Sequence, residues 1–482
     1  LSMAINITNN SISIESGDST GLNMTGEVTM LGIHGGKYSN PKILYNGLEC
    51  SNNICTNNTG LTGSVVRFNV TGFSNYSIGD GPLECKTLAV PNTIATLSED
   101  LSSGGTCFYV TANNITIDCT GYKITFGTDS GSDARGIDIN GTGNATIKDC
   151  NIVEGGSGAS NPAGIYSYYN GNNTIFRNNI TVVSTSGKAI DLNTSFNNIT
   201  DNNINASGST SDGIYMTLGN SSIIHNKFAA SQSDSSGIHL KGDADYILIA
   251  NNTFVNVTGD AIYLEGGDNN NISNNTFLVS PTNDIKKEDA ASNTWLIDQP
   301  VNAHTLKGDF NVRETAFGSI EFIGVDTASG LTGSNLSLAL NITNNTVSID
   351  GEIANLNVSA NITLLGVGDT VKTNPKIIRN GLECKAAVCT NYTGLTGTDV
   401  RFYVTQWSNY SIGDAPLECK TLDLPNVVTT LTEDLSAPAT CFKVAANNIT
   451  IDCAGYTISF GTSGGSDSRG IDINGTGNAT IK

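Results

Sequence analysis

Charged side chains are scarce in this sequence: Asp, Glu, Lys and Arg together make up only 14% of its 482 residues. Basic residues are the scarcer kind, with 24 Lys and Arg against 44 Asp and Glu, which gives a net charge of −20. Binding to nucleic acid needs a basic surface, so we expect no nucleic-acid partner. Disorder is also a poor interpretation, because segments rich in Ile, Val and Phe recur throughout and would collapse into a core.

Long apolar segments are missing as well. No run of about 18 apolar residues occurs, so we expect no membrane span here. The sequence has no signal peptide, begins at Leu1 without an initiator Met, and ends inside a motif whose first copy continues for many residues. We therefore interpret it as a window from a longer chain. Its 482 residues are too many for one core and predict at least two domains.

Cysteine, by contrast, is frequent and regularly placed. Eleven cysteines form two sets with matched spacings, and six per repeat is an even number, as expected for disulfides in an oxidising compartment. Zinc is disfavoured, because His partners and paired CxxC spacings are absent. The first set is Cys50, Cys55, Cys85, Cys107, Cys119 and Cys150, and the second is Cys384, Cys389, Cys419, Cys441 and Cys453.

The sequence repeats itself over a long period. AINITNNSISI from Ala4 matches ALNITNNTVSI from Ala339, and GIDINGTGNATIK from Gly136 recurs unchanged from Gly470. The period of 334 to 335 residues is long enough for a pair of domains. Tandem repetition of such a unit predicts a rod or fibre.

A shorter period lies within this unit. The pattern Ile-x-x-(Asn/Cys)-x-(Ile/Phe) recurs at steps of 28, 24, 24, 26 and 23 residues, and a second pattern, (Gly/Ala)-Ile, falls between its copies. Such steps, with short strands and no helical periodicity, predict the coils of a parallel β-helix with strands stacked about 4.8 Å apart. The first pattern begins at Ile147, Ile175, Ile199, Ile223, Ile249 and Ile272; the second contains Ile137, Ile165, Ile190, Ile214, Ile238 and Ile262.

Asparagines occupy one position of every coil and are predicted to be structural. We expect a left-handed turn at this position, with amide hydrogen bonds from coil to coil. Cys150 heads the same column and Cys119 lies one coil earlier, so we pair these two, and Cys85 with Cys107 at the lower end of the helix. The Asn ladder consists of Asn178, Asn202, Asn226, Asn252 and Asn275.

The flanking segments, residues 1–83 and 299–417, alternate apolar and polar residues, which predicts antiparallel β-sandwiches. Core aromatics are expected at corresponding positions, and Cys50–Cys55 and Cys384–Cys389 are expected to close short loops. We therefore predict an all-β chain with Ig-like sandwiches at 1–83 and 299–417, a right-handed parallel β-helix at 84–298, and a second one starting at 418–482. The core aromatics are Phe68, Phe73 and Tyr76 in the first sandwich and Phe402, Trp407 and Tyr410 in the second.

Two stretches resemble a known family. TLSEDLSSGGTCFYVTANNITIDCTGYKITF, followed by NATIKDCNI and NNTIFRNNI, is similar to archaeal secreted right-handed parallel β-helix proteins of the NosD-like or PbH1-repeat type. SNPKILYNGLECSNNICTN and VRFNVTGFSNYSI resemble the sandwich modules that accompany those helices. The resemblance implies an archaeal source and this architecture. It does not select a function, because the family includes surface-layer proteins, adhesins, filament components and carbohydrate-active enzymes.

One candidate chemical site is a charged column formed by Asp149, Arg177, Asp201 and His225 on successive coils. Such a column could supply the acid and base of a polysaccharide-cleaving enzyme. The alternative is a solvated salt-bridge ladder, which we favour, because alternating charge avoids repulsion between neighbouring rungs. We therefore predict no enzymatic activity.

A second outward column runs Asp138, Tyr166, Asp191, Tyr215, His239 and Tyr263. Tyr and His on a flat sheet can stack on sugar rings or contact another subunit. The simpler interpretation is cross-strand packing. The candidate assembly or glycan face is Tyr166, Tyr215, His239 and Tyr263.

Ions and glycans are the remaining ligands to consider. The acidic turns at 128–133 and 266–270 offer Ca²⁺ ligands, but turn chemistry explains their composition without metal and we expect no cofactor. Nearly thirty Asn-x-(Ser/Thr) sequons occur, and those in turns and loops are candidates for N-glycosylation. The candidates are Asn140, Asn193, Asn205, Asn220, Asn256 and Asn391.

Together these features predict a secreted, glycosylated structural subunit of an extracellular archaeal filament, appendage or surface layer, with identical subunits as partners. The alternative is a polysaccharide-binding adhesin, or a lyase-like or hydrolase-like enzyme, with surface polysaccharide as partner. Clustered carboxylates in a cleft would favour the alternative. Repetitive contacts between identical chains would favour the filament.

Overall fold

The computed structural model describes residues 5–8, 10–14, 24–33, 41–72, 74–80, 83–129, 133–140, 143–156, 158, 160–278, 281–333, 335–349, 356–367, 375–414, 418–431, 433–463, 467–474 and 478–482. Over these ranges the regular structure is β-strand, apart from the short helix α1 (Leu336–Ala339). Two compact units divide the chain: Leu1–Asn311 with Val325–Ser337, and Val312–Gly324 with Leu338–Lys482. The boundary falls within strand β36 (Phe310–Glu314).

The first unit starts with two antiparallel sheets that contribute to one core. Val28, Val66, Phe68 and Tyr76 in this core are almost completely buried, because apolar and polar residues alternate along the strands. Phe73 lies outside the described residues. One sheet has the order β1 (Ile5–Thr8), β2 (Ser11–Ile14), β8 (Asn75–Asp80), β4 (Pro41–Tyr45), β5 (Leu48–Glu49), and the other β3 (Gly26–Leu31), β7 (Val65–Val70), β6 (Cys55–Asn57).

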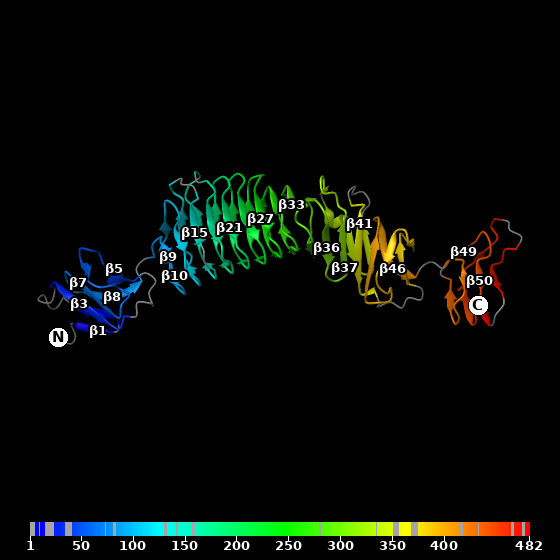
Figure 1. The fold of residues 1–482 in the computed structure, drawn as a ribbon, viewed down its shortest axis with the longest axis horizontal. Helices are drawn as coiled ribbons and strands as arrows, with labels where there is room; N and C mark the ends of the chain where they lie inside the picture. Colours follow the sequence, from blue (N-terminus) through cyan, green and yellow to red (C-terminus); the bar gives the residue numbers. More distant parts are fainter. Residues whose placement is uncertain are drawn as a thin grey trace. The chain divides into compact units, whose positions relative to one another are not determined.

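A parallel β-solenoid follows, in which each coil from β9–β11 to β30–β32 contributes one strand to each of three sheets (Figure 1). Sheet A contains β9 (Thr87–Leu88), β12 (Phe108–Val110), β15 (Arg135–Asn140), β18 (Ala163–Tyr168), β21 (Lys188–Asn193), β24 (Asp212–Leu218), β27 (Ser236–Asp243), β30 (Asp260–Leu264), β33 (Asn283–Lys287) and β35 (His304–Leu306), with β38 (Leu331–Gly333) antiparallel at its end.

Sheets B and C are built in the same way. Within the first unit, sheet B contains β10 (Ile94–Thr96), β13 (Thr116–Asp118), β16 (Thr146–Lys148), β19 (Thr174–Phe176), β22 (Asn198–Thr200), β25 (Ser222–Ile224), β28 (Leu248–Ala250), β31 (Asn271–Ser273) and β34 (Thr294–Ile297). Sheet C contains β11 (Leu101–Ser102), β14 (Lys123–Phe126), β17 (Asn151–Glu154), β20 (Asn179–Val182), β23 (Asn203–Ala206), β26 (Lys227–Ala230), β29 (Thr253–Val257) and β32 (Thr276–Phe277).

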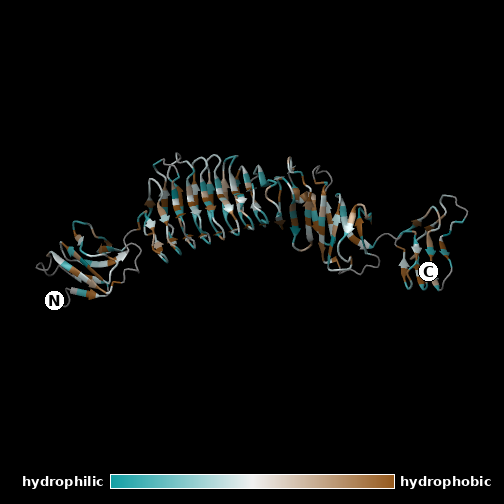
Figure 2. Cartoon of the chain, viewed as in Figure 1, coloured by the Kyte–Doolittle hydropathy of each residue, from teal (hydrophilic) through white to brown (hydrophobic). Residues whose placement is uncertain are grey.

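Stacked apolar side chains fill the solenoid. The two isoleucine ladders predicted from the sequence are confirmed: Ile190, Ile214 and Ile238 pair in register in sheet A, as do Ile199 and Ile223 in sheet B, and all are fully buried. Each such side chain contributes about 2 kcal/mol by leaving water. Figure 2 shows the result as brown bands that cross the strands.

Close contact between coils explains the (Gly/Ala)-Ile pattern. A Cβ at Gly213 would lie 2.4 Å from the carbonyl oxygen of Gly237, and one at Gly237 would lie 2.7 Å from that of Ala261. Little space for a side chain therefore remains at this position.

Buried asparagine amides connect the coils. Oδ1 of Asn202 accepts a hydrogen bond from the Asn178 backbone N–H at 2.9 Å, and its Nδ2 donates to the carbonyl of Ile175 at 2.9 Å. The expectation of a left-handed turn at these asparagines is wrong by one residue. The positive φ falls on the preceding residue, 55° at Arg177 and 56° at Asp201, so that the ladder asparagine points inward.

The second unit contains another antiparallel region. Phe402 and Tyr410 are fully buried in it. One sheet has the order β39 (Leu340–Thr343), β40 (Thr346–Ile349), β46 (Asn409–Asp414), β42 (Pro375–Arg379), β43 (Leu382–Glu383). The other contains β37 (Gly318–Ile323), β41 (Ser359–Leu365), β45 (Asp399–Val404) and β44 (Cys389–Asn391).

Parallel coils begin again near the end of the second unit. Their core includes Leu431, Phe442 and Ile451, which are almost fully buried. The strands are β47 (Thr421–Leu422), β50 (Phe442–Val444) and β53 (Ile471–Ile473); β48 (Val428–Thr430), β51 (Ile449–Asp452) and β54 (Ala479–Ile481); and β49 (Leu435–Ser436) with β52 (Ile458–Ser459).

Five disulfides occur, and they include every pair proposed from the sequence. The bridges are Cys50–Cys55, Cys85–Cys107, Cys119–Cys150, Cys384–Cys389 and Cys419–Cys441. Cys453, also assigned to a disulfide, is instead a free cysteine. It corresponds to Cys119 of the first copy, which is bonded to Cys150.

Candidate functional site

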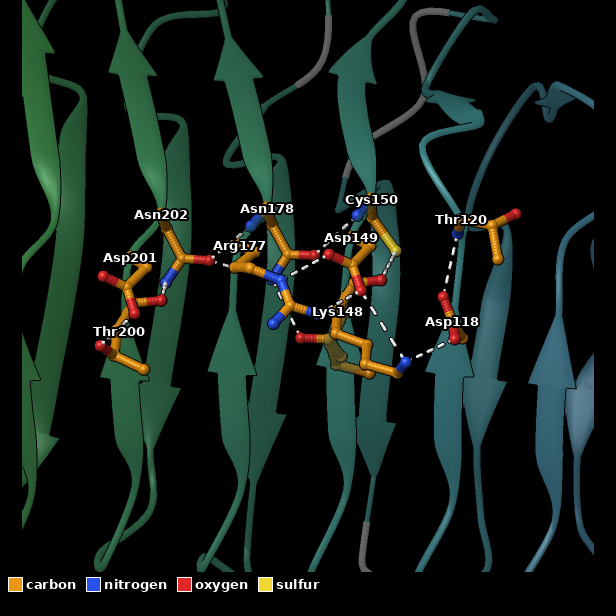
Figure 3. Close-up of polar contacts among 11 residues, drawn as sticks. Asp118, Thr120, Lys148, Asp149, Cys150, Arg177, Asn178, Thr200, Asp201 and Asn202 are labelled. Atoms are coloured by element: carbon orange, nitrogen blue, oxygen red, sulfur yellow. Dashed lines mark hydrogen bonds and ion pairs between the residues drawn. The ribbon is translucent and has the colours of Figure 1, made fainter.

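The charged column lies at the corner between sheets B and C, where Figure 3 labels its members Asp149, Arg177 and Asp201. Cys150, which is bonded to Cys119, directly follows Asp149. Arg177 holds Asp149 with two hydrogen bonds of 2.7 Å, from Nε to Oδ1 and from Nη2 to Oδ2. Lys148 Nζ lies 2.5 Å from Asp118 Oδ2 and 3.8 Å from Asp149 Oδ2. The hydrogen bond from Arg177 holds the pKa of Asp149 below its usual range.

Backbone geometry explains why polar residues gather in this column. Asp149, Arg177, Asp201 and His225 all have φ between 55° and 58°, and Asn251 continues the column at 55°. This left-handed conformation disfavours β-branched residues and favours short polar ones. The backbone conformation of the turn therefore accounts for polar residues in this column, without any requirement for a charged functional surface.

The predicted salt-bridge ladder forms only in part. In the described part of the chain, Asp149–Arg177 is an ion pair, but no ion pair joins Arg177 to Asp201 or Asp201 to His225. Asp201 instead accepts a hydrogen bond from Thr200 Oγ1 at 3.0 Å. Asp201 and His225 therefore do not meet as an acid and base pair.

The hollow beside this column is shallow and faces solvent. Asp118, Asp149, Arg177 and Asn179 are among its lining residues, and its volume is about 720 Å³. Both carboxylates are bound by neighbouring cations. The same pairing recurs in the second copy, where Lys482 Nζ lies 3.1 Å from Asp452 Oδ2, so the Asp118–Lys148 contact belongs to the repeated scaffold.

The aromatic column follows the outer face of sheet A. Tyr166, Asp191, Tyr215, His239 and Tyr263 pair in register on successive strands from β18 to β30. Asp138 precedes them on β15 and Lys286 follows on β33. The register predicted from the sequence is therefore present.

Cationic side chains cover three of the tyrosine rings. Arg135 lies 4.6 Å from the Tyr166 ring centre, Lys188 lies 5.0 Å from Tyr215, and Lys286 lies 4.0 Å from Tyr263. Cation–π contacts of this kind stabilise a half-buried face by about 1 kcal/mol each. These rings consequently offer little open surface for stacking on a sugar.

His239 lies at the centre of the column. Nδ1 is 3.1 Å from Asp212 Oδ2 and Nε2 is 3.0 Å from Glu265 Oε2, while Tyr263 stacks on the ring at 4.5 Å. Lys241 also contacts Glu265, at 2.8 Å. Only the doubly protonated imidazole can donate to both carboxylates at once. The sequence pattern did not indicate these two carboxylates, although Asp212 directly precedes the Gly213–Ile214 pair of its strand.

Two carboxylates of the face are poorly solvated. Burial raises the pKa of Asp138 and of Asp191, and Arg135 opposes this effect at both sites. Asp138 Oδ1 is buried and has no hydrogen-bond partner in the described structure. Asp191 accepts a hydrogen bond from Asn193 Nδ2 at 3.2 Å.

The candidate glycosylation sites differ in exposure. Asn140, Asn220, Asn256 and Asn391 are exposed. Asn193 in β21 and Asn205 in β23 were expected to be exposed, but both are half-buried. Asn193 also accepts a hydrogen bond from Thr217 Oγ1 at 2.6 Å, so its amide is engaged on both sides.

Metal ligands do not converge in the part of the chain that the structure describes, where no group of three His, Cys, Asp or Glu side chains could hold an ion. Of the acidic turn at 128–133, residues 130–132 lie outside the described ranges. No helix among the described residues is both long and apolar enough to cross a bilayer.

The parallel coils match one family model, described as periplasmic copper-binding protein (NosD), over residues 92–312. No curated protein matches the chain. A solved structure of DFA-IIIase from Arthrobacter chlorophenolicus A6 without its lid is 14% identical, with a TM-score of 0.26, over 45% of this chain and 59% of that one. A double mutant of the tailspike protein of E. coli bacteriophage HK620 is 8% identical, with a TM-score of 0.21, over 66% and 75%. The chain thus spans less than two thirds of the DFA-IIIase structure, and its coils are similar to those of NosD-like β-helix proteins.

Proposed function

We propose that this chain is a structural subunit of an extracellular archaeal filament, appendage or surface layer. In this proposal, Ig-like sandwiches at 1–83 and 299–417 alternate with right-handed β-helices at 84–298 and from 418, in units of about 334 residues. Identical subunits are its partners, and its exposed sequons carry glycans.

The observation that carries this proposal is the repetition of the same bonds in both copies. Cys50–Cys55 and Cys384–Cys389 have Cα separations of 5.9 and 6.0 Å. Lys42–Glu49 and Lys376–Glu383 are ion pairs of 2.6 and 2.7 Å. A binding or catalytic site is usually present once per chain, whereas repetition of an entire bonded module favours a building element.

The use of polar side chains supports the same conclusion. Amides of the Asn ladder bond to neighbouring coils, and Arg177 and Lys148 bond to Asp149 and Asp118. These groups resist separation of the coils. An exposed sheet edge at the end of a solenoid can pair with a further strand, which provides a route to polymers.

Copper binding, which the name of the matched family carries, does not fit this chain. Copper is held by His, Cys and Met side chains. Cys107, Cys119 and Cys150, the cysteines of the matched region, are all in disulfides, and no three His, Cys, Asp or Glu side chains converge among the described residues. We therefore assign no copper-dependent role.

Electron microscopy of the native material tests the proposal. We expect cell-surface filaments or a lattice with a regular repeat, labelled along their length by an antibody against residues 84–298. Fractionation should place the protein outside the membrane. A dispersed monomer in the native extract, or a cytoplasmic location, would contradict a structural role.

A further inference from the structure

Four exposed aromatic rings lie along the corner where the chain passes from sheet A to sheet B. Tyr168 is 41% exposed, Tyr169 70%, Phe196 63% and Tyr246 60%. Tyr168 and Tyr169 meet edge to face at 4.1 Å. We call these four residues the aromatic edge. Unlike the tyrosines of the sheet A face, none of them has a cation over its ring among the contacts of the described residues.

The corner itself does not favour aromatic residues. Phe196 and Tyr246 have φ of 62° and 53°, in a column whose other members include Asn144, Asn172 and Asn220. Asparagine adopts this left-handed conformation readily, whereas a bulky side chain is a steric outlier there. Tyr169, three residues before Asn172, has φ of 84°. Backbone strain of this kind is retained where a side chain has a role.

Backbone hydrogen bonds fix the order of these residues along the coils. The Asn172 N–H donates to the Ser195 carbonyl at 2.9 Å, the Phe196 N–H to Gly219 at 3.3 Å, and the Asn220 N–H to Asp245 at 2.7 Å. Phe196 and Tyr246 are thus two coils apart, or about 10 Å. The spacing between these two rings matches the length of a disaccharide unit in an extended polysaccharide.

The charge of the corner selects among saccharides. The loops at 168–173, 194–197, 218–221, 242–247 and 265–270 contain no Lys or Arg, but they do contain Asp243, Asp245, Glu265 and Asp268. The nearest cation, Lys241, directly precedes the loop at 242–247 and is already paired with Glu265 at 2.8 Å. An anionic polysaccharide would therefore meet a net negative corner and be repelled. Asparagine amides and serine hydroxyls in these loops can donate to and accept from sugar hydroxyls.

We propose that the aromatic edge is a binding site for a neutral polysaccharide chain that runs along the coils. The apolar faces of its sugar rings stack on Tyr169, Phe196 and Tyr246, and its hydroxyls bond to the amides between them. This activity goes beyond a structural role and does not depend on it. It would attach the protein to a cell wall or capsule glycan.

The test uses the full chain, produced in a bacterial periplasm so that disulfides form and the Asn220 sequon carries no glycan over the edge. Native gels containing dextran, laminarin or mannan measure binding to neutral polymers, and polygalacturonate is the anionic comparison. The test variant combines Tyr169→Asn, Phe196→Asn and Tyr246→Asn. Asparagine suits each backbone conformation, so this variant should fold at least as well as the parent.

We expect at least one neutral polymer to retard the parent chain, and the triple variant to bind it at least tenfold more weakly. Tyr392→Asn is the matched control, because Tyr392 is 58% exposed but lies in the second unit. It should bind like the parent. Absence of retardation in all three neutral gels, unchanged binding by the triple variant, or preference for polygalacturonate would overturn the proposal. A different result in analytical ultracentrifugation would also overturn it. If the parent sediments as a dimer and the triple variant as a monomer, the aromatic edge binds a second copy of the chain.

Discussion

Lys287 is a lysine buried completely inside the solenoid, at the end of β33. Its Nζ donates hydrogen bonds to the carbonyls of Lys307, at 2.6 Å, and Glu288, at 3.4 Å. Burial lowers its pKa from 10.5 to about 8. Between these two values the unfolded chain binds the proton and the folded chain does not, so folding becomes more favourable as pH rises.

Replacement of Lys287 by Met should reveal this linkage. From pH 7 to pH 10.5, the parent chain should gain about 3 kcal/mol of unfolding free energy relative to Lys287→Met, since each pKa unit corresponds to about 1.4 kcal/mol. Urea unfolding at both pH values measures the difference. Lys227→Met, at an exposed lysine, is the control, and an equal pH response in both variants would refute the assignment.

Asn226 is the central amide of the ladder and is 1% exposed. Its Oδ1 accepts from the Asn202 backbone N–H at 2.9 Å and its Nδ2 donates to the Ile199 carbonyl at 2.8 Å. Asn226→Ala leaves both groups unpaired in the interior, so we expect a loss of about 2–4 kcal/mol in chemical denaturation.

The control is Asn203→Ala, which removes an exposed amide pair with Asn179. It should cost less than about 0.5 kcal/mol. Equal costs at Asn226 and Asn203 would mean that the ladder adds nothing beyond surface hydrogen bonding.

Periodicity predicted which asparagines stack, but not their backbone conformation. The assignment of the left-handed turn to Asn178 and its equivalents failed because two adjacent residues are candidates for it. Before Asn202 and Asn252 the preceding residue is itself Asp201 or Asn251, which adopts this conformation as readily, so residue type alone does not decide between the two positions. Likewise, Gln299 ends the ladder, where its side-chain oxygen accepts a hydrogen bond from the Asn275 backbone N–H at 2.7 Å. The repeat pattern did not predict this role, because Gln299 lies outside it.

At the scale of elements, the Cys119–Cys150 disulfide links the corner after β13 with the corner after β16, on two neighbouring coils. It closes 31 residues, for which the chain-entropy argument gives about 3–4 kcal/mol. Cys119→Ser with Cys150→Ser should therefore increase hydrogen exchange at the amides of β13 and β16.

The same pair of substitutions at Cys384 and Cys389 provides the comparison, because that bridge lies in the second unit. Exchange in β13 and β16 should stay unchanged there. If hydrogen exchange in β13 and β16 becomes faster after both double substitutions, the effect is a general one of disulfide loss. The Cys119–Cys150 bridge would then not stabilise its own coils specifically.

Strands and their pairing were the most predictable elements, because every coil repeats the same inward positions. The side-chain network around His239 was not predictable in the same way. Asp212 and Glu265 belong to other coils, and their approach to His239 depends on strand offsets that alternation alone does not specify. The aromatic edge was missed for a similar reason: Phe196 and Tyr246 occupy positions at which the pattern indicates asparagine.

At the scale of the whole molecule, the two compact units should unfold separately. Differential scanning calorimetry should show at least two transitions, with a calorimetric enthalpy larger than the van't Hoff enthalpy. Reduction of the disulfides should lower both transition temperatures, because each unit contains bridges. A single two-state transition would show that the units fold as one.

The repeated coil has a consequence for how such proteins change over evolutionary time. Asn202 bonds to Asn178 on one side and Asn226 on the other, each 24 positions away, so every coil meets neighbours of its own kind. Duplication or deletion of one whole coil would leave each new junction chemically unchanged. Such proteins can therefore lengthen or shorten in fixed increments of about 4.8 Å. The number of coils encoded by the gene then sets the length of the solenoid, and Gln299 caps the end of the Asn ladder.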